Sequence, residues 1–321
     1  MVVEMMGGLG NQMFVYAFAK ALELGLGGGK KVVIDGSAYR ANPNSAYPRG
    51  LAITDFNLSM SIDIHYRFNK IARFNAGYLL YGLNQFIHKK PKDSSYKSHK
   101  YRHYCVVSKE MLEDENLIKN VTKLHDSTYF RGAFQHLHCF SHIESIIRKE
   151  FTLKSPLSPA NQRLKERILA TQDSVFLHIR RGDYLQIPHF IKLASGYYNG
   201  ALRAILARVS NPYIFVFSDD IDFAKSHLLK YLDSSLTSKT KWEFMSGNEN
   251  NPVQEMELMR SCKHAIIANS TFSWWAAYLM ANPHKVVAMP SSFFYDDTIP
   301  KAQYLKQNGY IEIDYNWGFE V

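Results

Sequence analysis

Residues 178–184 have the sequence HIRRGDY and directly follow an apolar run, 175–177, that predicts a buried strand. Ligands of open α/β sheets bind outside the carboxyl ends of the strands. An arginine side chain offers a planar fork of donors that matches a phosphate group, and it stays charged at any working pH. The segment therefore predicts an anion site for a phosphate-bearing ligand. The alternative is a structural ion pair in which Arg181 and Asp183 neutralise each other.

Residues 7–12 have the sequence GGLGNQ and lie between a short apolar run and a stretch of helical periodicity. Backbone amides at such a junction can hold an anion, because the start of a helix exposes free N–H groups. Gly8 and Gly10 match the first two glycines of the dinucleotide-binding fingerprint, but Met13 stands where that fingerprint has its third glycine. A tight turn without a ligand is the alternative.

Residues 269–275, with the sequence NSTFSWW, also follow a predicted strand and begin a predicted helix. Ser270 and Thr271 are typical helix N-cap residues, because their hydroxyls accept hydrogen bonds from free backbone amides. The same hydroxyls and amides could face a phosphate group, and the two interpretations are compatible.

Two segments raise the question of a metal ion. Asp220 and Asp222 follow another apolar strand and could hold a divalent metal, as acidic pairs do in one class of sugar transferases. We favour the alternative that they begin a helix, where acids cap free amides and complement the helix dipole. A histidine-rich segment has loose zinc-ligand spacing without a matching second pair, so we predict no metal there: His136, His138, Cys139 and His142.

Strands and helices alternate along the chain, which favours parallel sheets built from βαβ units. A segment with two prolines among serines, 152–159, predicts a linker, so we expect an N-terminal domain at 1–154 and a C-terminal domain at 155–321. We predict no elements between about 60 and 105. The expected strands are 1–6, 32–35, 175–180, 213–217, 242–245, 265–268 and 286–289, and the expected helices are 13–22, 160–171, 197–209, 221–232, 253–261 and 272–280.

The composition is that of a soluble globular protein: of 321 residues, 46% are apolar and 21% are charged. The net charge of +9 comes from scattered basic residues rather than a long basic run, so we expect no nucleic-acid partner. Three cysteines without a close pair suit a reducing compartment. Since we find neither a signal peptide nor an apolar span, we expect a cytoplasmic protein.

The three junctions occur in an order that resembles the α-1,2-fucosyltransferases of glycosyltransferase family 11, and more distantly the α-1,6- and protein O-fucosyltransferases. The resemblance implies a GT-B fold, in which two Rossmann-like domains with parallel sheets face a cleft. The implied donor is GDP-L-fucose, bound mainly by the C-terminal domain without a metal or other cofactor. The acceptor would lie on the side of the N-terminal domain. The matching segments are 7–22, 130–132, 178–184, 217–220 and 255–279.

The resemblance also implies roles for donor-binding residues. Arg180 would bind the β-phosphate, and His178 would lie near the guanine or the ribose. Ser270 and Thr271 would donate hydrogen bonds to the pyrophosphate. Glu255 stands where related enzymes usually have an aspartate that pairs with guanine, and its side chain is one methylene longer.

The N-terminal domain and the catalytic base complete the predicted site. Asn11 would reach the fucose or phosphate of the donor, next to the amides of Gly8 and Gly10. Asp183 is the acid within the HIRRGDY segment, and we consider it equally as the general base and as an ion-pair partner of Arg181.

We therefore hypothesise an inverting, metal-independent transfer of L-fucose to the 2-hydroxyl of a terminal β-galactose, as in the synthesis of an O-antigen or capsule glycan. A peripheral contact with the inner membrane surface is compatible with this function. One alternative is a metal-dependent sugar transferase that uses Asp220 and Asp222. The other is a non-catalytic module that binds a nucleotide or a glycan.

Overall fold

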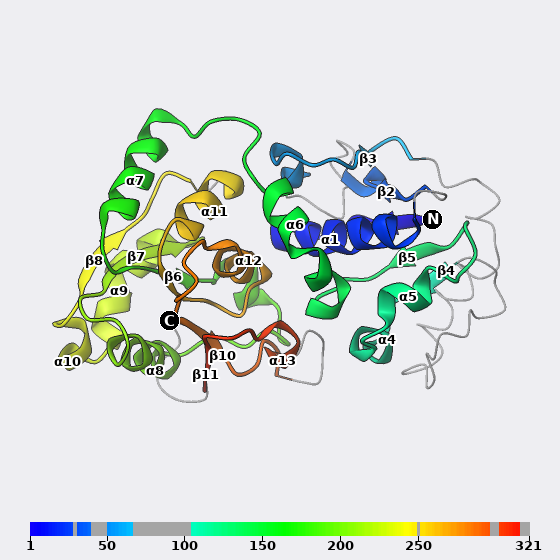
Figure 1. Cartoon of the computed structure of the whole chain (residues 1–321). Coiled ribbons are helices and arrows are strands. Elements are labelled where there is room, and N and C mark those ends of the chain that lie inside the picture. Colours follow the sequence, from blue (N-terminus) through cyan, green and yellow to red (C-terminus); the bar gives the residue numbers. More distant parts are fainter. Residues whose placement is uncertain (28–30, 40–49, 67–103, 249–250, 296–301, 315–321) are drawn as a thin grey trace. The chain divides into compact units, whose positions relative to one another are not determined.

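The chain divides into two compact α/β units, residues 1–152 and 153–321. The computed structural model describes residues 1–27, 31–39, 50–66, 104–248, 251–295 and 302–314 (Figure 1). Most of the segment between about 60 and 105, for which the sequence predicts no elements, lies outside the described residues, namely 67–103. None of the helices in the described ranges is long and apolar enough to cross a membrane.

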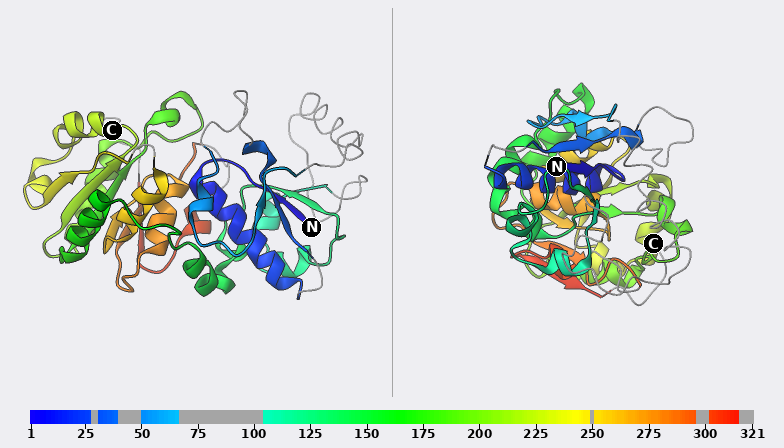
Figure 2. Two further views of the ribbon diagram at one scale, coloured as in Figure 1. Left: turned by 90° about the horizontal axis from the view of Figure 1, so that it is seen from above. Right: turned by 90° about the vertical axis from the view of Figure 1, so that its right-hand side faces the viewer.

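The first unit contains a five-stranded parallel sheet in the order β3-β2-β1-β5-β4. Helix α1 lies against one face of this sheet (Figure 2). Phe18 of α1 packs edge-on against Phe130 of β5, with ring centroids 5.6 Å apart. The elements are β1 (Val2–Glu4), α1 (Leu9–Gly25), β2 (Val33–Asp35), η1 (Ser37–Tyr39), η2 (Ala52–Asp55), β3 (Ile62–Asp63), β4 (Tyr104–Val106), α4 (Lys109–Glu113), α5 (Leu117–Val121), β5 (Tyr129–Arg131), η3 (Leu137–Cys139), η4 (Ser141–Ile143) and α6 (Glu144–Glu150).

The second unit contains a six-stranded parallel sheet in the order β11-β10-β9-β6-β7-β8. This is the strand order of a doubly wound nucleotide-binding sheet. The elements are α7 (Pro159–Ala170), β6 (Ser174–Ile179), η5 (Gly182–Gln186), α8 (Ser195–Leu206), β7 (Tyr213–Ser218), α9 (Ile221–Tyr231), α10 (Ser234–Thr237), β8 (Lys241–Phe244), α11 (Pro252–Arg260), β9 (His264–Ile266), α12 (Thr271–Leu279), β10 (Val287–Pro290), α13 (Ala302–Leu305) and β11 (Tyr310–Ile313).

The alternation of side chains along β6 decides which groups reach which face of the second sheet. Leu177 and Ile179 belong to the apolar core that packs against α8 and α9. His178 points to the opposite face, where its ring lies 5.7 Å from that of Phe272 in α12. This period of two is a property of any strand, so the buried apolar run also fixes the direction of the histidine.

The second sheet has one point where the order of the strands reverses. There β6 pairs with β7 on one side and β9 on the other, so the loops after β6 and β9 leave the sheet in opposite directions. In the first unit β1 is the central strand, between β2 and β5. Ligands of doubly wound sheets bind in the crevice at a reversal of the strand order.

Candidate active site

The strand reversal in the second unit brings together two of the segments predicted from the sequence. Arg180 and Arg181 follow β6, and Ser270 and Thr271 follow β9, which is paired with β6. The hydroxyl of Tyr184, in η5, donates to the backbone oxygen of Asn269 at 3.2 Å and ties the two loops together. The sheet therefore places the arginines beside the start of α12.

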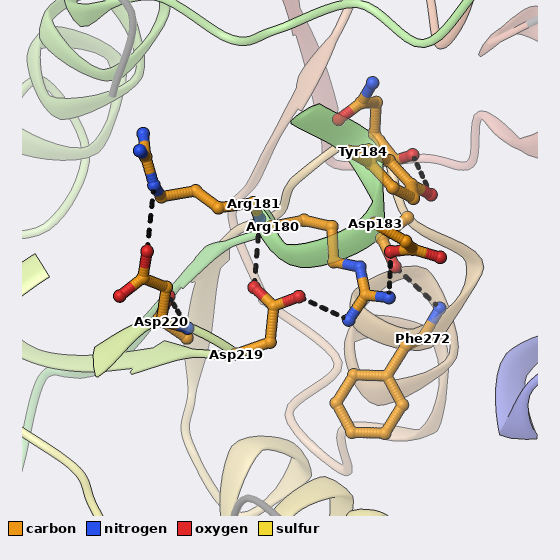
Figure 3. Close-up of polar contacts among 10 residues, drawn as sticks. Arg180, Arg181, Asp183, Tyr184, Asp219, Asp220 and Phe272 are labelled. Atoms are coloured by element: carbon orange, nitrogen blue, oxygen red, sulfur yellow. Dashed lines mark hydrogen bonds and ion pairs between the residues drawn. The ribbon is translucent and has the colours of Figure 1, made fainter. Parts of the chain in front are cut away.

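Arg180 is held between two carboxylates (Figure 3). Its Nη2 donates to Oδ1 of Asp183 at 2.6 Å, and its Nη1 lies 2.8 Å from Oδ2 of Asp219. The guanidinium also lies over the ring of Tyr184, 5.3 Å from the centroid. Because the Arg180 side chain is only 15% exposed, these contacts fix the direction of its donors.

Arg181 points the other way (Figure 3). Its Nε donates to Oδ2 of Asp220 at 3.3 Å, and its guanidinium carbon lies 3.3 Å from the centroid of the Phe223 ring. The ion pair between Arg181 and Asp183, which the sequence analysis considers as an alternative, is therefore wrong, since Asp183 pairs with Arg180. The reason is that consecutive residues of an extended chain direct their side chains to opposite sides.

Asp219 is a site residue that the sequence analysis missed. Its Oδ1 accepts a hydrogen bond from the backbone N–H of Arg181 at 2.9 Å, while its Oδ2 faces Arg180. A Cβ atom on Gly182 would lie 2.4 Å from that Oδ2, so the glycine leaves room for the carboxylate. Strand pairing is the observation that identifies Asp219. Since Ile179 pairs with Ser218, the residues that follow them, Arg180 and Asp219, are neighbours.

His178 is buried and neutral. Loss of solvation, and then the nearby charge of Arg180, lower its pKa from 6.5 to about 3. Among the described residues its Nδ1 has no hydrogen-bond partner, although the atom is buried. Buried polar atoms nearly always have a partner, so a ligand polar group next to this ring would complete it.

The start of α12 is capped as the sequence predicts. Oγ of Ser270 accepts a hydrogen bond from the backbone N–H of Phe272 at 3.3 Å, and Thr271 is the first helical residue. The Asn269 amide donates to the backbone oxygens of Ile191 and Phe293 at 2.9 and 3.0 Å. The junction is therefore rigid, and the positive end of the α12 dipole faces the same edge as Arg180.

Asp220 has the capping role that we favoured over metal binding. Its Oδ1 accepts from the backbone N–H of Phe223 at 3.2 Å, and its other oxygen pairs with Arg181. Asp222 is exposed in the first turn of α9. Across the ranges that the structure describes, no group of three or more histidine, cysteine or acidic side chains lies close enough together to hold a metal ion.

Glu255 lies half-buried in the first turn of α11. A network of buried amides holds the segment in front of it. Nδ2 of Asn161 donates to Oδ1 of Asn248 at 2.7 Å and to Oε1 of Gln254 at 2.6 Å, and Oδ1 of Asn251 caps the helix. The start of α11 is thus fixed to the start of α7, whatever group Glu255 recognises.

In the first unit, Asn11 lies in the first turn of α1, which follows the central strand β1. Its Oδ1 accepts a hydrogen bond at 2.8 Å from Nε2 of Gln135, which follows β5. Gln12 fixes the glycine loop, since its Nε2 donates to the backbone oxygens of Gly7 and Gly50 at 3.0 and 2.9 Å. The sequence analysis missed Gln135 because it found no strand at β5.

Gly8 and Gly10 belong to the start of α1, the former as its N-cap residue and the latter inside its first turn. The helix has no side-chain cap and no acid in this turn. Glu4, the last residue of β1, lies nearby in sequence and pairs with Arg131 at 3.3 Å. Burial raises the pKa of Glu4, while the charge of Arg131 opposes that shift.

The second unit therefore offers a fixed guanidinium, a helix N-terminus and a neutral buried imidazole at one edge of its sheet. The first two favour a phosphate or pyrophosphate group. The imidazole next to them is neutral, so it can form a hydrogen bond with the uncharged nucleoside part of such a ligand. The arrangement suits a nucleotide-bearing ligand.

The chain is similar to known sugar transferases. The chain is 28% identical over 306 residues to the alpha-1,2-colitosyltransferase of Escherichia coli, covering 91% of this chain and 92% of that protein. It is 30% identical over 181 residues to the galactoside 2-alpha-L-fucosyltransferase Sec1 of Mus musculus, covering 52% and 47%.

The crystal structure of NodZ alpha-1,6-fucosyltransferase soaked with GDP-fucose superimposes with a TM-score of 0.50 at 15% identity, covering 89% of this chain and 94% of that one. With two units that each contain a parallel sheet, this likeness confirms the predicted GT-B fold class. The family described as glycosyl transferase family 11 matches residues 1–313. The chain therefore belongs to glycosyltransferase family 11 and is an enzyme of that class.

Proposed function

We propose that this enzyme transfers L-fucose from GDP-β-L-fucose to the 2-hydroxyl of a terminal β-galactose, with inversion and without a metal ion. The observation that carries the proposal is Arg180, held by two carboxylates beside the start of α12. The name of the mouse relative supports a galactoside acceptor and a linkage to its 2-position. The NodZ crystals were soaked with GDP-fucose, which supports the same donor for this chain.

The chemistry follows from where charge develops. As the bond between C1 of fucose and the β-phosphate oxygen breaks, its electron pair leaves with GDP, and the sugar becomes oxocarbenium-like. Arg180 and the amides at Thr271, capped by Ser270, would stabilise the negative charge on the phosphate. His178 would face the ribose or guanine, and Glu255 would contact the guanine.

The acceptor side needs a base. The 2-oxygen of galactose forms the new bond to C1, and its proton moves to a carboxylate. We propose Asp183 for this role, since its side chain is 42% exposed and contacts Arg180. Asn11, with the amides of Gly8 and Gly10, is proposed to contact the donor, and the acceptor-binding role of the first unit remains a prediction.

A metal-dependent reaction is the first alternative. It would need the Asp220 carboxylate to bind a cation, but both of its oxygens already have partners, Phe223 and Arg181. The two mechanisms differ in one measurement: the metal-independent reaction keeps its rate in excess EDTA, and the metal-dependent one stops.

Transfer of colitose is the second candidate, because the Escherichia coli relative that matches almost the whole chain is named a colitosyltransferase. Colitose is L-fucose without its 3-hydroxyl, so the two donors share every phosphate and nucleoside contact. The ratio of kcat/KM for GDP-fucose and GDP-colitose decides between them. A cytoplasmic location, with or without contact at the inner membrane surface, remains a prediction from the sequence.

The deciding experiment incubates the purified protein with GDP-fucose and lactose, in the presence and absence of EDTA, and determines the product linkage by NMR. We expect fucose α-linked to the 2-position of galactose in both reactions. A screen of β-galactosides that differ in the penultimate sugar follows, to find the preferred acceptor. If no β-galactoside is fucosylated, or if EDTA abolishes the reaction, the proposal is wrong as stated.

A further inference from the structure

Arg181 is charged and mostly buried, directly after the arginine that we assign to the phosphate. Its side chain is 14% exposed, and its guanidinium carbon lies 3.3 Å from the centroid of the Phe223 ring in α9. Its charge also acts on Tyr198 in α8, where it opposes the rise in pKa that burial causes. Charged side chains lose this much solvent only where other groups hold them. The neighbours of Arg181 therefore fix its position.

Three contacts join Arg181, Asp220 and Phe223 into a closed triangle at the start of α9. Nε of Arg181 donates to Oδ2 of Asp220 at 3.3 Å, and Oδ1 of Asp220 accepts from the backbone N–H of Phe223 at 3.2 Å. The ring of Phe223 covers the guanidinium of Arg181 and completes the triangle. A cation over an aromatic face contributes more when it is desolvated than when it is exposed. The triangle therefore fixes the loop after β6 to the start of α9.

The backbone of Arg181 connects this triangle to Arg180 (Figure 3). Its N–H donates to Oδ1 of Asp219 at 2.9 Å, and Oδ2 of Asp219 lies 2.8 Å from Nη1 of Arg180. The loop thus holds Asp219 at one oxygen, and Asp219 holds the guanidinium of Arg180 at the other. A shift of about 1 Å in the loop takes either contact beyond hydrogen-bonding distance. The direction of Arg180 therefore depends on where the triangle places the loop.

We propose that Arg181 and Phe223 are positioning residues, which fix the direction of Arg180 through Asp219 and do not contact the donor themselves. This inference rests on the proposed function, since it takes the donor phosphate as the ligand of Arg180. It gives different roles to two adjacent arginines: Arg180 binds the phosphate, and Arg181 holds the loop in place. It also extends the site to α9, which packs on the face of the sheet opposite to α12.

Phe223→Leu tests the triangle directly. Leucine keeps an apolar side chain at this position but has no aromatic face, so the contact with the Arg181 cation is lost. We expect GDP to bind about three- to tenfold more weakly than to the wild type. Phe223→Tyr keeps the aromatic face, so GDP binding should stay within about twofold of the wild type.

His227→Leu is the matched control. His227 lies one turn further along α9, and its ring stacks on that of Phe223 with centroids 4.4 Å apart. The variant therefore removes an aromatic contact from the same helix but leaves the three contacts of the triangle in place. Its GDP binding should stay within about twofold of the wild type.

A double-mutant cycle shows whether Phe223 acts through Asp219. In the Asp219→Ala background the connection to Arg180 is already broken, so Phe223→Leu should weaken GDP binding by less than about twofold. A general disturbance of the second unit would instead weaken GDP binding by the same factor in both backgrounds.

Arg181→Lys is the second variant of the triangle. It keeps the charge but loses the Nε donor and the planar group that stacks on Phe223. It should weaken GDP binding as much as Phe223→Leu does, and the combination of both substitutions should bind no more weakly than either alone. If Phe223→Leu does not fold, Arg181→Lys in the wild-type and Asp219→Ala backgrounds gives the same test.

The measurement is calorimetric titration of each purified variant with GDP at one ionic strength, together with thermal unfolding to confirm that each variant is folded. An equal loss of affinity in both backgrounds overturns the proposal. So does a further loss when Phe223→Leu is added to Arg181→Lys, since Arg181 would then bind the nucleotide itself. Unchanged affinity in both single variants refutes the positioning role alone, whereas a wild type that binds no GDP refutes the proposed donor and this role with it.

Discussion

Gly182→Ala is the substitution that tests the geometry around Arg180 most directly. The added Cβ would lie 2.4 Å from Oδ2 of Asp219, whereas ordinary contacts begin at 3.4 Å. The Asp219 carboxylate must therefore move by about 1 Å, which carries its contacts past hydrogen-bonding distance. The affected contacts are those to Nη1 of Arg180, 2.8 Å, and to the backbone N–H of Arg181, 2.9 Å.

The size of the effect follows from the ion pair with Arg180, whose two side chains are mostly buried. We take about 1–2 kcal/mol for this pair, a value between that of an exposed ion pair and that of a hydrogen bond to a charged group. That loss corresponds to about a 5- to 30-fold decrease in kcat/KM for the donor. The assay is initial-rate kinetics with varied GDP-fucose and saturating lactose. Thermal unfolding confirms that the variant is folded.

A double-mutant cycle shows whether the alanine acts through Asp219. In the Asp219→Ala background the carboxylate is absent, so the added Cβ has nothing to displace, and Gly182→Ala should cost less than about twofold. If Gly182→Ala lowers kcat/KM by the same factor in both backgrounds, the reasoning is refuted. The alanine would then act on the loop itself.

Three further outcomes are expected. Arg180→Lys keeps the charge but loses the planar fork, so kcat should fall by about 10²-fold, and near-full activity contradicts the phosphate role. Burial lowers the pKa of His178 from 6.5 to about 3, so between these values the unfolded chain binds a proton that the folded chain excludes. The contribution of His178 to stability is therefore complete above about pH 6.5, and below it the free energy of unfolding falls by about 1.4 kcal/mol per pH unit. The variant His178→Gln should lack this decline when urea unfolding is measured between about pH 7 and 5. An equally steep decline in the variant refutes this. Gln135→Glu replaces the amide that donates to Oδ1 of Asn11 with an acceptor, so the Asn11 amide should rotate and present its oxygen instead of its NH₂. We expect a higher KM for GDP-fucose with unchanged thermal stability, and an unchanged KM counts against a role for Asn11 in donor binding.

The second unit could be predicted largely from the sequence. Every strand and helix that we predict between 160 and 289 has a counterpart in the structure, because buried parallel strands are continuous apolar runs and the helices between them are amphipathic. The elements that were not predicted are η5, α10, α13 and β11. Two of these are helices of four residues, which are too short for a periodic pattern to appear.

The first unit was harder to predict. Its strands have two or three residues each, so β4 and β5 left no recognisable apolar run. Gln135 was missed for this reason, since its position beside Asn11 depends on the pairing of β5 with β1. A polar residue in a loop carries no signal until the neighbouring strand is known.

For the candidate site, the residue types could be predicted from the sequence, but the pairing of the side chains could not. The residue types of the HIRRGDY segment predict an arginine that binds an anion, but the ion pair that they offer as an alternative joins Asp183 to the wrong arginine. The direction of a side chain at the end of a strand depends on the pleat, and its partner comes from the neighbouring strand. Asp219 could therefore be identified as a site residue only once the strand pairing was known.

The pairing of β6 with β9 also bears on when the site forms during folding. Tyr184 and Asn269, which tie the two loops, are 85 residues apart along the chain. Contacts of such high sequence separation form late and slowly, because the intervening chain must first be ordered. A nascent or truncated chain that ends before β9 thus contains the arginines without the helix that completes their site. A nucleotide bound as we propose would stabilise the second unit only after this crossover has closed.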